Sequence, residues 1–151
     1  MYLAFKDLAY LFADSRGAKE PNLLFYTVTD QSKVLQPKGI FIPLNKESGE
    51  LSEAIANGAI AAIWDKAQNL PLYTPSQFPV FFTEDPVEAV RILLQLYLEK
   101  LDGETEKKMD MTKFDFLNKK LLNKNNQTYD IAVMLKRAEA ENKDVYPERR
   151  G

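Results

Sequence analysis

The sequence predicts an α/β fold, in which a small and mainly parallel sheet is flanked by helices. Two almost continuous apolar runs, Ala59 to Trp64 and Val80 to Thr83, have the length of strands. Such runs are typical of parallel strands that helices cover on both faces. Patterns of helical periodicity precede the first run and follow the second, as expected of helices that connect parallel strands. At 151 residues, of which 45% are hydrophobic, the chain has the size of one domain with a real core.

The N-terminal part predicts a short helix, a loop and two strands. Apolar residues at mixed three- and four-residue steps favour an amphipathic helix over residues 3–12, and a polar loop containing glycine and proline follows over 14–22. Leu23 to Val28 and Gly39 to Leu44 are rich in β-favouring residues and are predicted to be strands. A short polar loop connects these two strands.

Two more helices are predicted around the apolar runs. Glu50 to Asn57 carries its aliphatic residues on one side, and Gly58 stands where a helix end needs a left-handed residue. Asp85 and Pro86 mark the start of a longer helix, because aspartate accepts hydrogen bonds from free N–H groups and proline fits the first helical position. Apolar residues recur every three or four positions from Val87 to Leu101, which predicts a wide stripe packed on the sheet.

A charged stretch, Glu104 to Asp110, marks the expected domain edge. Residues 1–103 are therefore predicted to form the α/β domain, and residues 104–151 a charged linker with a helical tail. The helical patterns of the tail comprise Phe114, Leu117 and Leu121 after a Thr112 to Asp115 cap, and Ile131, Met134, Leu135 and Ala138 after a polar loop at 123–128. Neither helix is long enough to be stable alone, so we expect the tail to pack on the domain or on a second subunit.

Composition argues against several classes of function. A net charge of −2 and a pI near 5.3 argue against the broad basic surface of nucleic-acid binders. Cysteine and histidine are absent from the sequence, which removes thiolate nucleophiles, disulfides, imidazole bases and zinc sites built on those side chains. The N-terminal residues include Asp7 and no uninterrupted apolar run, so we expect a cytoplasmic protein with neither a signal peptide nor a membrane span.

The segment from Asp30 to Phe41 resembles a known signature. It reads D-Q-S-K-V-L-Q-P-K-G-I-F and is similar to D-S-R-x-V-x-P-G-x-x-F, which opens the N-terminal, UDP-binding domain of Mur ligases of the MurE and MurF type. The residues in register are Ser32, Lys33 in place of arginine, Leu35 in place of valine, Pro37 and Phe41. Mur ligases of this type add amino acids to the UDP-N-acetylmuramoyl precursor of peptidoglycan, the polymer of the bacterial cell wall.

Two further motifs follow in the order of the family, so the resemblance covers roughly residues 1–100. Ala54 to Ala59 resembles the helix end A-x-x-x-G-A, and Pro79 to Ala89 resembles a strand-to-helix turn. The chain departs from the family at Gln31, where the family has aspartate. It also departs at Leu44 to Gly49, where the family has a longer, glycine-containing loop that helps to hold the uridine nucleotide.

The resemblance implies a fold and a ligand class but not the ligase reaction. The sequence contains no G-x-x-G-K-T loop, whose backbone N–H groups would cradle the phosphates of ATP. We therefore expect no enzyme activity and no bound cofactor. The predicted function is a stand-alone module that associates with another protein or with itself, in cell-envelope synthesis or its regulation. The alternative is a weak binder or sensor of UDP-N-acetylmuramoyl precursors.

The resemblance also implies the residues of a ligand site. These are Ser32, Lys33 and Pro37 in the signature, and Asn45, Lys46 and Ser48 in the altered loop. Serine and lysine can hydrogen-bond a uracil or a phosphate, but an ordinary solvated turn explains the same residues without a ligand. Trp64 ends an apolar strand and is predicted to pack in the core or at its rim rather than to stack on a base.

Overall fold

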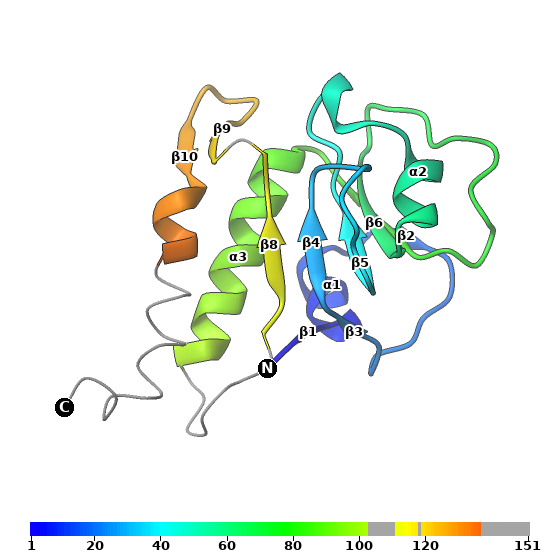
Figure 1. Ribbon diagram of the computed structural model, residues 1–151, viewed down its shortest axis with the longest axis horizontal. Helices are drawn as coiled ribbons and strands as arrows, with labels where there is room; N and C mark the ends of the chain where they lie inside the picture. The colour runs from blue at the N-terminus through cyan, green and yellow to red at the C-terminus, as the bar shows by residue number, and fades with distance from the viewer. Residues whose placement is uncertain (103–110, 118, 137–151) are drawn as a thin grey trace.

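The computed structural model describes residues 1–102, 111–117 and 119–136. The predicted linker at 104–110 and the predicted tail beyond residue 136 lie outside these residues. A sheet of six strands in the order β2-β7-β6-β5-β4-β8 runs through the described part (Figure 1). Its strands are β2 (Ser15–Arg16), β4 (Thr27–Thr29), β5 (Gly39–Phe41), β6 (Ala59–Asp65), β7 (Val80–Thr83) and β8 (Lys113–Asp115). β2 is antiparallel to β7 and every other pair in this sheet is parallel, which confirms the predicted α/β class.

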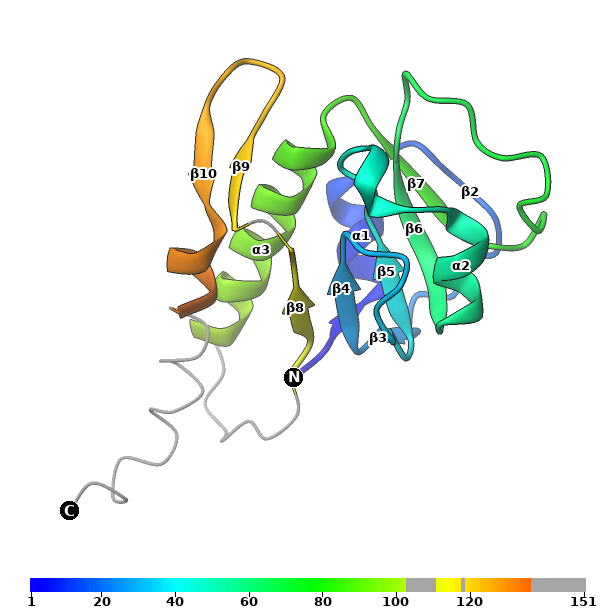
Figure 2. The ribbon, with the colours of Figure 1, turned by 45° about the horizontal axis from the view of Figure 1, so that its top comes forward.

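Helices lie on both faces of the sheet (Figures 1 and 2). The helices are α1 (Phe5–Leu11), α2 (Leu51–Ala56) and α3 (Pro86–Asp102). Successive residues of a strand point to opposite faces. Ile40 of β5 packs in a cluster with the apolar side chains of α1 and α3, whereas its neighbour Phe41 packs in a second cluster with Leu51 and Ala54 of α2. The strands of the centre are therefore covered on both faces, as their apolar sequences predict.

Two helix boundaries follow the sequence signals. α3 begins at Pro86, and the Oδ1 atom of Asp85 accepts hydrogen bonds from the backbone N–H groups of Val87 and Glu88 (3.2 and 3.3 Å). α2 ends ahead of Gly58, whose φ of +115° lies in the region that favours glycine. The predicted helix start and helix stop are both confirmed.

A buried hydrogen-bond network joins segments far apart in the sequence. The hydroxyl of Thr112 donates to the carbonyl of Phe25 (2.7 Å) and accepts from the N–H of Leu3 (2.8 Å), 109 positions away. The hydroxyl of Tyr97 on α3 accepts from the N–H of Thr112 (2.9 Å) and donates to the carbonyl of Met1 (2.6 Å). Leu3 and Phe25 belong to a small antiparallel pair, β1 (Leu3–Ala4) and β3 (Leu24–Phe25). The network therefore fixes this pair to α3 and to the entry into β8.

The predicted helix over Phe114, Leu117 and Leu121 is wrong. β8 occupies the start of this stretch, and β9 (Lys120–Leu122) follows and pairs with β10 (Thr128–Asp130). Phe114 and Phe116 are buried while Lys113 and Leu117 are exposed, so the side chains alternate with the period of a strand. Pairing along β4 satisfies backbone groups and buries both phenylalanines, which a short exposed helix cannot do. The second predicted helix is confirmed over residues 131–136, and Ala138 of its pattern lies outside the described residues.

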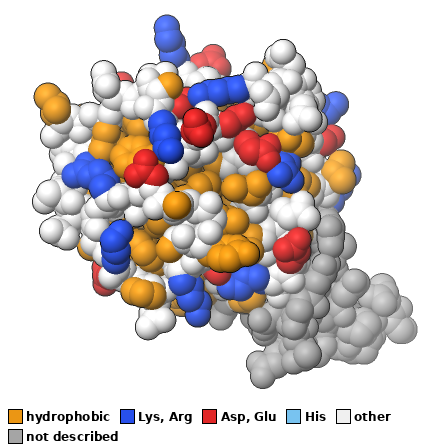
Figure 3. All heavy atoms as spheres, turned by 180° about the vertical axis from the view of Figure 1, so that it is seen from behind, with side chains coloured by type: hydrophobic (Ala, Val, Ile, Leu, Met, Phe, Trp, Pro, Cys, Tyr) orange, Lys and Arg blue, Asp and Glu red, His pale blue; other side chains and the backbone are white. Residues whose placement is uncertain are grey.

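The surface seen from behind in Figure 3 carries hydrophobic side chains near its centre, with charged side chains scattered among them. Large hydrophobic side chains are also exposed in the C-terminal segment, at Leu117, Leu122 and Val133. Within the ranges that the structure describes, no helix combines the length and the apolar character needed to cross a membrane.

Candidate functional site

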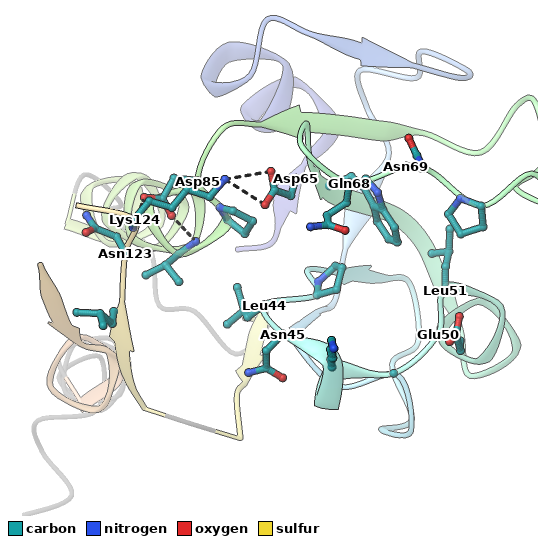
Figure 4. Close-up of a pocket in the computed structure, with 18 residues that line it drawn as sticks. Leu44, Asn45, Glu50, Leu51, Asp65, Gln68, Asn69, Asp85, Asn123 and Lys124 are labelled. Atoms are coloured by element: carbon teal, nitrogen blue, oxygen red, sulfur yellow. Dashed lines mark hydrogen bonds and ion pairs between the residues drawn. The ribbon is translucent and has the colours of Figure 1, made fainter. Parts of the chain in front are cut away.

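A crevice of about 550 Å³ opens at the edge of the sheet where the parallel strands end (Figure 4). Ligands of α/β proteins bind at this edge, beyond the carboxyl ends of the strands. The walls come from the segments that follow β5, β6 and β7 and from the β9–β10 hairpin. The lining residues are Pro43, Leu44, Asn45, Lys46, Gly49, Glu50, Leu51, Trp64, Asp65, Gln68, Asn69, Pro71, Asp85, Pro86, Val87, Leu122, Asn123 and Lys124.

The segment after β5 forms one wall and is held by its own hydrogen bonds. The hydroxyl of Ser48 accepts from the backbone N–H groups of Leu44 and Asn45 (3.0 and 3.4 Å). The Oδ1 atom of Asn45 accepts from the N–H of Glu47 (2.9 Å), which closes the short 3₁₀ helix η1 (Lys46–Ser48). Ser48 is buried in this turn, whereas Asn45 and Lys46 stand at exposed positions that line the crevice.

Ser32 packs against the turn instead of facing the crevice. Its side chain is buried, and its hydroxyl donates to the Oε1 atom of Glu53 on α2 (2.6 Å). Its N–H donates to the carbonyl of Ser48 (2.8 Å), and its carbonyl accepts from the side-chain amide of Asn57 (2.8 Å). These contacts attach the connection between β4 and β5 to α2, so the structure gives Ser32 a supporting position.

The structure brings only part of the predicted ligand site to the crevice. Asn45 and Lys46 line it, while Ser32, Lys33, Pro37 and Ser48 do not. Lys33 and Pro37 are exposed on the connection between β4 and β5.

We expect the Gly49→Ala substitution to lower the free energy of unfolding by about 3 kcal/mol. Gly49 has φ +94° and ψ −166°, a region that costs a residue with a side chain about 1–3 kcal/mol, and an added Cβ would also clash with the hydroxyl of Ser32. Urea unfolding measures this effect in four proteins: the parent, Gly49→Ala, Ser32→Ala and the double variant Ser32→Ala/Gly49→Ala. In the Ser32→Ala background the cost should be smaller, because the clashing oxygen is gone while the backbone strain and the close approach to the Cβ atom of residue 32 remain. An equal cost in both backgrounds would contradict the contact.

Trp64 and Asp65 form the end of β6 at the base of the crevice. Trp64 packs on the apolar cluster of α2 and also lines the crevice, which confirms the predicted packing at the rim of the core. Its Nε1 atom is buried and makes no hydrogen bond to the residues that the structure describes. The Oδ1 atom of Asp65 accepts from the N–H of Ala67 (2.9 Å). Trp64 is the single tryptophan of the chain, so its fluorescence reports on this place alone.

The β9–β10 hairpin forms the opposite wall. The backbone N–H of Lys124, in the turn of the hairpin, donates to the Oδ2 atom of Asp85 (2.9 Å). Its ammonium group lies 3.2 Å from the carboxylate of Asp65. Dashed lines mark this contact in Figure 4. Two carboxylates, one at the end of β6 and one just after the neighbouring β7, thus hold one residue of the hairpin.

The hairpin is also attached to α3. The hydroxyl of Tyr129 donates to the Oε1 atom of Glu88 (2.8 Å), and the guanidinium of Arg91 lies 5.4 Å from the centre of the Tyr129 ring. Arg91 also donates from Nε to the Oε2 atom of Glu88 (2.8 Å). This bond, helped by the tyrosine hydroxyl, lowers the pKa of Glu88, so the carboxylate stays charged and keeps the hairpin in place.

A third strand-end carboxylate, Asp30 after β4, lies away from the crevice. It is buried, and its Oδ1 atom accepts from the N–H of Leu117 (3.1 Å) just beyond β8. Burial raises its pKa, against the opposing effect of that hydrogen bond. Asp30 therefore joins β4 to the C-terminal segment.

The crevice residues that the sequence did not assign to a ligand site include Trp64, Asp65, Asp85 and Lys124. Asp65 and Asp85 do carry a signal, because each follows an apolar run read as a parallel strand, and such ends meet at one edge of a sheet. Lys124 carries no such signal in the sequence. Its position in the crevice depends on a hairpin, and this stretch was predicted to be a polar loop.

The comparisons with known proteins identify no family. No protein-family model matches the chain, and no curated protein matches it. Among the described residues, no group of three or more carboxylate, thiol or imidazole side chains is placed to hold a metal ion.

Proposed function

We propose that the protein is a non-catalytic module that binds a small, phosphate-bearing ligand in the crevice at the carboxyl edge of its sheet. The observation that carries this proposal is the open crevice itself, bounded by three strand ends and a hairpin. Its volume of about 550 Å³ falls within the usual range of ligand pockets, roughly 300–1,000 Å³. Apolar side chains such as Leu51 and Trp64 lie beside polar ones, as in sites that orient a ligand by a few polar contacts.

The ligand class that we favour is a UDP-linked sugar of the UDP-N-acetylmuramoyl type. Its support is the similarity of residues 1–100 to the N-terminal domain of Mur ligases, together with the place of the altered loop. Asn45 and Lys46 of this loop line the crevice. The loop lacks the first glycine of the family, which removes a close backbone approach, so we expect weak binding with a Kd in the millimolar range, roughly −4 kcal/mol.

The non-catalytic character is supported by the state of Asp65 and Asp85, two of the three carboxylates that line the crevice. Both oxygens of Asp85 accept backbone N–H groups, and Asp65 accepts an N–H and pairs with Lys124. A general base needs a free lone pair directed at its substrate. These two carboxylates are instead engaged in holding the walls together.

Titration with UDP and with UDP-N-acetylmuramoyl-alanine, followed by the fluorescence of Trp64, tests the proposal. We expect saturable quenching with a millimolar midpoint, and a midpoint about fivefold higher in Lys46→Met, because an exposed charge contact contributes up to about 1 kcal/mol. Lys33→Met is the matched control, since Lys33 belongs to the signature but lies outside the crevice. Absence of quenching with both compounds up to 10 millimolar, on the order of tenfold above the expected Kd, would contradict the proposal.

Association with a protein is a second candidate, favoured by exposed aliphatic side chains in the C-terminal segment. Leu117 and Val133 are each 62% exposed. Large exposed hydrophobic side chains favour a protein contact when they form a continuous patch. Sedimentation of the full chain over a range of concentrations tests association with a second copy.

A further inference from the structure

We propose that Lys124 binds the anionic group of the ligand, and that it exchanges its contact with Asp65 for a contact with that group. This inference rests on the proposed function and adds a residue from outside the region that resembles Mur ligases. It assigns the β9–β10 hairpin a binding role, as the wall that faces the charged part of the ligand.

The turn of the hairpin fixes the backbone of Lys124. The Oδ1 atom of Asn123 accepts from the N–H groups of Asn125 and Gln127 (2.9 Å each), and Asn126 has the left-handed φ of +64° that completes the turn. The N–H of Lys124 is itself held by Asp85. The lysine therefore starts from a defined point at the rim of the crevice.

The base of the hairpin is equally well anchored. Leu121, in the middle of β9, is 6% exposed, and Ile131, directly after β10, is 0% exposed. Both belong to the apolar cluster that includes the side chains of α3. Since the hairpin is fixed at its base and at its turn, a ligand meets a lysine whose backbone position is set before binding, which reduces the ordering cost.

The Lys124 side chain, in contrast, is free to exchange partners. Its side chain is 50% exposed, and its only ion pair among the described residues is with Asp65, whose side chain is 17% exposed. An ion pair this open to water contributes little, typically less than about 1 kcal/mol. A phosphate accepts stronger, charge-assisted hydrogen bonds from an ammonium group, so replacing Asp65 by a phosphate is favourable.

The hydrogen-bonding groups left over in the crevice fit an anion. The carboxylates of Asp65 and Asp85 are already engaged. Lys46 on the facing wall makes no ion pair or hydrogen bond to the described residues, and the ammonium of Lys124 has three protons for one carboxylate partner. Glu50 is the one lining carboxylate whose side chain has no partner among the described residues. Two ammonium groups with unused donors stand against this single carboxylate, which matches a ligand rich in acceptors.

The test compares UDP with uridine, which lacks the phosphates, in the full chain. We expect Lys124→Met to weaken UDP binding about tenfold while changing uridine binding by less than about twofold, because only the charged contact is lost. Lys124→Arg should restore most of the UDP affinity. Asp65→Asn should strengthen UDP binding by a few-fold, because it removes the carboxylate that competes for Lys124. The same substitution should have no such effect in Asp65→Asn/Lys124→Met, where the lysine is absent. Lys120→Met, an exposed lysine on the same hairpin, is the matched control.

The outcomes separate the two proposals. The role of Lys124 is contradicted if UDP binds the Lys124→Met variant as tightly as it binds the parent. It is also contradicted if this variant loses affinity for uridine and for UDP equally. In both cases the crevice remains a binding site. If neither compound binds the parent, the proposed function fails and the role of Lys124 fails with it. The melting temperature of each variant shows whether the hairpin is still in place.

Discussion

Deleting residues 111–151 is expected to leave a chain that does not fold to a stable state. Among the residues that the structure describes, the deletion removes four buried apolar side chains, Phe114, Phe116, Leu121 and Ile131. At about 1.5–3 kcal/mol each, their burial contributes roughly 6–12 kcal/mol, which is comparable to the whole net stability of a small domain. The deletion also exposes the edge of β4, because β8 is its partner on that side.

Near-ultraviolet circular dichroism and a thermal melt of residues 1–110 measure this effect. We expect no cooperative transition and a tendency to aggregate. The matched control is a chain that ends at residue 136, which keeps every buried residue that the structure describes and should melt cooperatively. A cooperative transition of residues 1–110 at the temperature of the full chain would show that β8 and the hairpin contribute nothing to the core.

The hydroxyl of Tyr97 is expected to make the stability fall steeply above pH 10. Burial raises the pKa of Tyr97 from 10.0 to about 12, since the phenolate would lie in the core of the protein. The unfolded chain releases this proton near pH 10, and the folded protein holds it up to about pH 12. The contribution to the free energy of unfolding is therefore constant below pH 10 and falls by about 3 kcal/mol as the pH rises from 10 to 12.

Urea unfolding of the parent and of Tyr97→Phe between pH 7 and pH 12 measures this contribution. At pH 7 the variant should be less stable by about 1–3 kcal/mol, because the N–H of Thr112 and the carbonyl of Met1 lose this partner. Above pH 10 the difference should shrink, because phenylalanine has no proton to lose. Tyr10→Phe is the control, since Tyr10 is 80% exposed. A difference between parent and Tyr97→Phe that stays constant with pH would contradict the buried, neutral hydroxyl.

The sequence predicted the central fold well because its signals are local. The apolar runs that form β6 and β7, the Asp85-Pro86 helix start and the glycine stop at Gly58 each depend on a few neighbouring residues. The C-terminal strands depend on distant partners. Helical spacing fits Phe114, Leu117 and Leu121. The strand β8 forms instead because it pairs with the edge of β4, which is distant in the sequence and is reached only after the chain has passed through α3. The alternation of Lys113, Phe114, Asp115 and Phe116 is the local signal that favours the strand.

The crevice was predictable only in part, for the same reason. Asn45 and Lys46 were found because they follow a predicted strand in a loop that could be compared with a family. Ser32 was placed at the ligand by its register in the signature, but the connection that carries it folds onto α2 and buries it against Gly49. The wall that contains Lys124 comes from a hairpin whose position is set by Asp65, Asp85 and the core. No pattern of neighbouring residues in the sequence predicts these contacts of the hairpin with Asp65, Asp85 and the core.

The most direct test of the ligand site is a titration of the isotope-labelled protein with UDP, followed by the backbone amide resonances. The site predicts that the largest shifts fall in the segments 44–51, 64–69 and 122–124, with Lys33 and its neighbours nearly unchanged. Shifts centred on residues 31–37 would place the ligand at the signature instead. The absence of any shift at UDP concentrations about tenfold above a millimolar Kd would contradict the crevice as a nucleotide site.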